Sequence, residues 1–64
     1  ALAEALERDP RSSYIWGLVG LLREAEGDLE GALAAYHIVD EIRPGSVQRL
    51  IEGVTTRLQE GGGD

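Results

Sequence analysis

Two proline-centred breaks, 34 residues apart, constrain the fold of this chain more than any other feature of its sequence. Asp9-Pro10-Arg11-Ser12 recurs as Arg43-Pro44-Gly45-Ser46, and Ala5 before the first break corresponds to Val39 before the second. The residue before a proline is pushed out of the helical region, so we expect the first helix to end at Asp9. A serine that follows such a break is a good helix N-cap, so a new helix should begin there. The sequence therefore predicts helices that repeat with a fixed period.

Apolar residues recur at helical spacing along four segments around these breaks, and no segment has the alternation of a strand. The stop and start residues between the segments are Gly27, a C-terminal stop, and Asp28 and Ser46, two N-caps. The second segment is apolar over so wide a face that it should be buried on two sides. We expect an all-α fold of four antiparallel helices, at residues 2–8, 13–26, 29–42 and 47–60.

The length of 64 residues allows one small domain, with a disordered tail expected at residues 61–64. Chains this short usually need disulfides, a metal or association for stability. The chain has no cysteine and one histidine, which excludes disulfides and makes a protein-held zinc ion very unlikely. Association, or a longer parent chain, is the remaining route.

The net charge of −6 excludes two classes of partner. Nucleic acids and anionic membranes both require clustered basic residues. No apolar run approaches the roughly 20 residues of a membrane span, so membrane insertion is not expected. All six basic residues are arginine, which is typical of a GC-rich genome. We therefore expect a bacterial protein, on the cytoplasmic or the periplasmic side of the cell.

The middle of the chain resembles the tetratricopeptide repeat, a helix–turn–helix unit of 34 residues. The family pattern W-x2-L-G-x2-Y, A-x3-F, P is matched by Trp16-x2-Val19-Gly20-x2-Arg23, then Ala32-x3-Tyr36, then Pro44. The Gly27-Asp28 turn is also similar to the family's usual turn. Only Arg23 departs clearly from the pattern, because it replaces an aromatic residue.

The resemblance implies a right-handed α-solenoid in one domain, residues 1–60. Residues 13–46 would be a full repeat and residues 1–10 the second half of a preceding one. Residues 47–60 would be half of a following repeat or a capping helix. In such a repeat Gly20 faces Ala32, so that two helices approach closely.

Stacked repeats form a concave groove lined by the first helix of each repeat, and such a groove suits a helix or an extended peptide. We therefore expect a non-catalytic module that binds a partner protein or peptide. The alternative is that the groove residues pack against a neighbouring helix or another copy of the chain. The resemblance places in the groove Tyr14, Gly17, Leu18, Leu21, Glu24, Gln48, Ile51, Glu52 and Thr55.

Self-assembly is the second hypothesis, because about three repeats are usually needed to bury a continuous core. A chain with one repeat and two halves would present apolar helix faces at both ends. Copies of the chain could then form a dimer or a head-to-tail series. The residues on these end faces are Leu2, Leu6, Val47, Leu50, Ile51, Val54 and Leu58.

The sequence provides no catalytic, cofactor or metal site. His37 lies one helical turn from Asp40, a spacing that a surface hydrogen bond explains. Carboxylates gather near the second turn at Glu24, Glu26, Asp28 and Glu30, but without the alternating ligands and central glycine of a calcium loop. We therefore expect neither an enzyme nor a metalloprotein.

Overall fold

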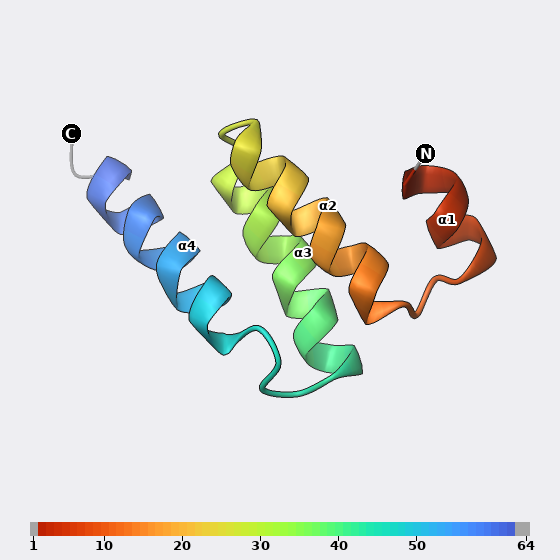
Figure 1. The fold of residues 1–64 in the computed structure, drawn as a ribbon. Helices are drawn as coiled ribbons and strands as arrows, with labels where there is room; N and C mark the ends of the chain where they lie inside the picture. Colours follow the sequence, from red (N-terminus) through yellow and green to blue (C-terminus); the bar gives the residue numbers. More distant parts are fainter. Residues whose placement is uncertain (1, 63–64) are drawn as a thin grey trace.

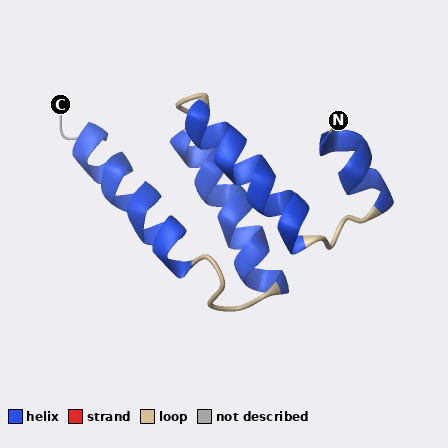
Figure 2. Cartoon of the chain, in the orientation of Figure 1, coloured by secondary structure: helices blue, strands red, loops and turns tan. Residues whose placement is uncertain are grey.

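The computed structural model describes residues 2–62, and these residues form four α-helices and no strand. The helices are α1 (Leu2–Arg8), α2 (Ser13–Ala25), α3 (Leu29–Ile42) and α4 (Gln48–Gly62). They run up and down in sequence order and are joined by three short loops (Figures 1 and 2). The expected all-α class and the order of the four helices are confirmed.

The last helix differs most from its predicted bounds. It begins at Gln48 and continues through Gly61 and Gly62, into the tail that was expected to lack structure. Residues 63 and 64 lie outside the described part. The predicted cap of this helix is wrong as well, because the Ser46 hydroxyl donates to the Arg43 carbonyl at 2.8 Å. Ser46 thus closes the turn that follows α3.

The turn between α2 and α3 follows from its residues. Gly27 has a φ of +84°, a left-handed conformation that glycine adopts without strain. The Asp28 N–H donates to the Arg23 carbonyl at 2.8 Å, and the Gly27 N–H donates to the Glu24 backbone carbonyl at 3.0 Å. This pair of bonds is the Schellman arrangement that ends a helix. The Asp28 carboxylate then caps α3 by accepting from the Gly31 N–H at 2.9 Å, as predicted.

The helices lie beside one another in a thin slab. The Cα atoms extend over 40 × 24 × 11 Å, so the shortest dimension of the molecule is less than half of the next one. The helix α3 packs against α2 and α4, and α1 packs against α2 (Figure 1). Because so flat an arrangement leaves two broad faces to solvent, few side chains are fully enclosed.

The core lies where α3 meets its two neighbours. The side chains of Tyr36 and Val54 are fully enclosed, and Trp16 of α2 packs against the core that contains them. Other core residues are Ala32, Val39 and Val47, with Leu29, Leu33, Ile51 and Leu58 packed around them.

The helices α2 and α3 pack tightly at Gly20. A Cβ placed on Gly20 would lie 2.6 Å from Cδ1 and 2.8 Å from Cζ of the Tyr36 ring. Gly20 therefore makes room for the aromatic ring of Tyr36, and the expected contact of Gly20 with Ala32 stays a prediction. Ala32 is fully enclosed in the same core.

Candidate functional site

Several large apolar side chains of α2 lie outside the core and are exposed to solvent. The sequence predicted a helix buried on two sides; α3 and α1 both pack against α2, but they bury it only in part. Only Gly20 of α2 is fully buried, while Tyr14 is 74% exposed and Leu21 and Leu22 are each 49% exposed. A helix that is apolar all round normally has its surface covered. In this slab α3 covers one side of α2 and short α1 covers part of another.

We call Tyr14, Gly17, Leu18, Leu21 and Leu22 the α2 stripe. Their spacing of three and four residues places them along one side of the helix. Leu18 is half-buried, and a Cβ built on Gly17 would meet no atom within 4 Å. The stripe is thus an apolar ridge with a shallow dip at Gly17. Leu22 was missed, although its place in the apolar pattern could have identified it.

Glu24, which was expected in the groove, serves the fold instead. Its carboxylate accepts from the Tyr36 hydroxyl at 2.9 Å and pairs with the Arg57 guanidinium at 3.4 Å. One side chain therefore joins α2, α3 and α4. Burial, followed by the hydrogen bond and the charge of Glu24, raises the pKa of Tyr36 to about 12.

The groove residues expected on α4 differ from one another in exposure. Gln48 and Glu52 are exposed, Thr55 is half-buried, and Ile51 packs against the core. The helix α4 packs against α3, and its link to α2 includes the Arg57–Glu24 pair. Of the residues predicted for the groove, the exposed large apolar ones are Tyr14 and Leu21, and both lie on α2.

The expected self-association face at α4 is largely turned inward. Val47 and Val54 are buried and Leu58 packs against the core, so the prediction that they form an open face is wrong. The physical reason is that α4 has one apolar face, and that face is used against α3. Leu50 is the exception, at 39% exposed. At the other end, Leu2 and Leu6 are half-buried.

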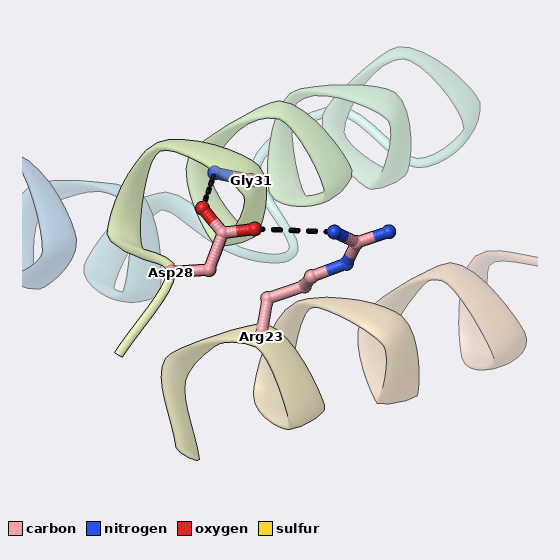
Figure 3. A network of polar contacts seen from close by, with 3 residues as sticks. All are labelled: Arg23, Asp28 and Gly31. Carbon is pink, nitrogen blue, oxygen red and sulfur yellow. Dashed lines mark hydrogen bonds and ion pairs between the residues drawn. The ribbon is translucent and has the colours of Figure 1, made fainter. Parts of the chain in front are cut away.

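Arg23, the residue that departs from the repeat pattern, has a specific partner. Its guanidinium lies 3.1 Å from the Asp28 carboxylate, which also accepts from the Gly31 N–H (Figure 3). The Gly31 N–H, and secondarily Arg23, lower the pKa of Asp28 below its usual value. The three residues connect the last turns of α2 to the first turn of α3.

The two side chains considered for acid–base chemistry, His37 and Asp40, have structural or surface positions. Asp40 accepts from the Gly45 N–H at 2.9 Å, so it holds the turn after α3, and His37 is exposed. Within residues 2–62 no three carboxylate, histidine or cysteine side chains converge as metal ligands would. A shallow pocket of about 390 Å³ lies between α1 and α2 and is lined by Glu4, Ala5, Arg8, Asp9 and Ile15.

Comparison of the chain with protein-family models, with curated proteins and with solved structures finds no match. No helix in the described part combines the length and the apolar character needed to cross a bilayer.

Proposed function

We propose that the chain is a non-catalytic protein-interaction module that binds a helix or an extended segment on the α2 stripe. The observation that carries this proposal is the exposure of Tyr14, Leu21 and Leu22 on a single helix. Monomeric proteins rarely leave contiguous apolar residues uncovered, and those that do commonly use them for binding. Aromatic and leucine anchors at helical spacing suit a partner helix laid along them.

We also propose that the module is built as a tetratricopeptide-type repeat. Three observations support this: the antiparallel α2–α3 pair, the close contact of Gly20 with the Tyr36 ring, and the left-handed Gly27 in the turn. Apart from Leu50, the large outward residues of α4 are polar, as expected for a helix that caps such a stack. They include Gln48, Arg49, Glu52, Thr56, Gln59 and Glu60.

Affinity capture with three matched baits tests the proposal. The baits are the parent chain, the stripe variant Tyr14→Ala/Leu21→Arg, and the control Ala34→Arg/His37→Ala on the exposed side of α3. Circular dichroism first establishes that all three are folded. We expect a partner that binds the parent and the control and is lost with the stripe variant. Equal recovery of the same proteins by all three baits would contradict the proposal.

A further inference from the structure

The α2 stripe is complementary to itself. Tyr14 and Leu21 lie at equal distances, in opposite directions along the chain, from the point between Gly17 and Leu18. A two-fold contact requires that residue i meets residue j while j meets i. Two antiparallel copies of α2 centred on that point would place each Tyr14 against the other Leu21. Each Leu18 would then lie over the open space at the other Gly17.

On this basis we propose that the partner of the α2 stripe is the α2 stripe of a second copy, in an antiparallel two-fold dimer. The inference rests on the proposed function, because it names the partner of the same face. Gly17 has room for it, since no atom lies within 4 Å of a Cβ placed there. A protruding leucine set into the gap at a glycine is the kind of fit that lets two helices pack closely.

The distribution of charge favours the antiparallel orientation. Residues 23–30, at the end of α2, carry four carboxylates and one arginine. A parallel pair would bring two of these acidic turns together, which is repulsive. The antiparallel pair keeps them apart and brings each acidic turn towards residues 4–11 of the other copy, which carry two arginines and three carboxylates and are thus less negative than a second acidic turn. It also opposes the two helix dipoles.

The size of the chain is consistent with such a dimer. A standard interface covers about 800 Å² of each partner. The molecule exposes 4497 Å², so an interface of that size would use less than a fifth of its surface. A slab with few enclosed side chains gains apolar burial by pairing one broad face, which is a usual route to stability for small domains.

Sedimentation equilibrium of the full chain is the first test, with Gly17→Gln as the diagnostic variant. Glutamine is a better helix former than glycine, so the isolated monomer should melt at a higher temperature. The same side chain would fill the gap that receives Leu18, so the dimer dissociation constant should rise about tenfold or more. A variant that strengthens the fold while weakening association cannot be explained by misfolding. If Gly17→Gln leaves the dissociation constant unchanged, the proposed contact is wrong.

A charge exchange tests the register. Tyr14→Glu and Leu21→Lys should each form a weak homodimer. In both contacts across the two-fold axis, the new charged side chain would then lie against an apolar residue of the other copy. An equimolar mixture should recover a heterodimer, in which one Glu–Lys pair and one Tyr14–Leu21 contact form across the axis. Leu50→Lys in place of Leu21→Lys is the matched control and should recover nothing. Absence of the heterodimer would overturn the antiparallel register.

Failure of this inference differs from failure of the proposed function. A parent chain that stays monomeric up to millimolar concentration, yet binds a different protein through the stripe, overturns the dimer and leaves the interaction module in place. A chain that neither self-associates nor loses any partner on Tyr14→Ala/Leu21→Arg overturns both.

Discussion

Two glycines on α2, Gly17 and Gly20, have the same local conformation and opposite surroundings. A side chain at Gly20 would run into the ring of Tyr36, whereas a side chain at Gly17 would meet no atom within 4 Å. Glycine in a helix interior costs up to about 1 kcal/mol relative to alanine. The packing of Tyr36 compensates for that cost at Gly20, and nothing within the monomer does so at Gly17.

Alanine substitutions at the two positions should therefore have opposite effects. Gly20→Ala should lower the free energy of unfolding by up to about 2 kcal/mol, because overpacking of about 1–3 kcal/mol is partly offset by up to about 1 kcal/mol of better helix propensity. Gly17→Ala should raise it by up to about 1 kcal/mol. Urea denaturation in dilute solution measures both values. Two changes of the same sign would mean that the contact with Tyr36 is not as described.

Asp28 should make the free energy of unfolding depend on pH in the acidic range. Its pKa is lowered in the folded chain, chiefly by the Gly31 N–H and then by Arg23, from an ordinary value of 3.8. The folded state therefore binds this proton more weakly than the unfolded state does. The stabilisation is fully present above pH 3.8 and is lost as the pH falls through the folded pKa.

The comparison of the parent with Asp28→Asn isolates this contribution. Asparagine can still cap α3, but it does not titrate. Urea unfolding from pH 7 down to pH 2.5 should show the difference between the two proteins shrinking at the acidic end. A difference that stays constant over that range would rule out Asp28 as a source of acid sensitivity.

At the scale of the elements, the hydrogen bond from Tyr36 to Glu24 holds α3 against α2, with Arg57 of α4 on the same carboxylate. The pKa of Tyr36 rises from 10.0 to about 12 on folding. The folded state thus holds this proton more tightly, and its stabilisation is complete below pH 10. It is lost as the pH rises from 10 to about 12.

Tyr36→Phe should remove this alkaline dependence. We expect the variant to melt at a lower temperature than the parent at pH 8, because Glu24 loses its hydroxyl donor. Between pH 10 and 12 the melting temperature of the parent should fall more steeply than that of the variant. Thermal denaturation monitored by circular dichroism measures both trends, and parallel curves would contradict the assignment.

For the molecule as a whole, the slab arrangement predicts a gradient of local stability. The helix α3 is packed on both sides, α4 packs against α3, and none of the seven residues of α1 is buried. Isolated helices shorter than about 12–15 residues are marginal in water. Opening of α1 should therefore cost far less than global unfolding.

Native-state hydrogen exchange followed by NMR measures this gradient. Amides of α1 should exchange fastest, those of α4 more slowly, and those in the centre of α3 only through global unfolding. Protection of α1 equal to that of α3 would show that α1 has a partner other than α2.

The sequence by itself determined the helices and their turns. Caps, breakers and apolar spacing act within a few residues, so Gly27 and Asp28 could be assigned from local pattern alone. The pattern allowed Ser12 or Ser13 as the cap of α2, and the structure has Ser12. The end of α4 was misjudged because Gly61 and Gly62 disfavour a helix, yet the helix continues through them.

Only the tertiary structure decided which apolar faces meet one another. The sequence shows a wide apolar face on α2 and a single one on α4, but not which of these faces α3 covers. In the structure α3 covers the apolar face of α4, whereas Tyr14, Leu21 and Leu22 of α2 stay exposed. Likewise, the spacing of Glu24 did not show that Tyr36 and Arg57 converge on it. Local pattern records how apolar a helix is, whereas its exposure depends on how many neighbours surround it, and a slab four helices wide and 11 Å deep provides few.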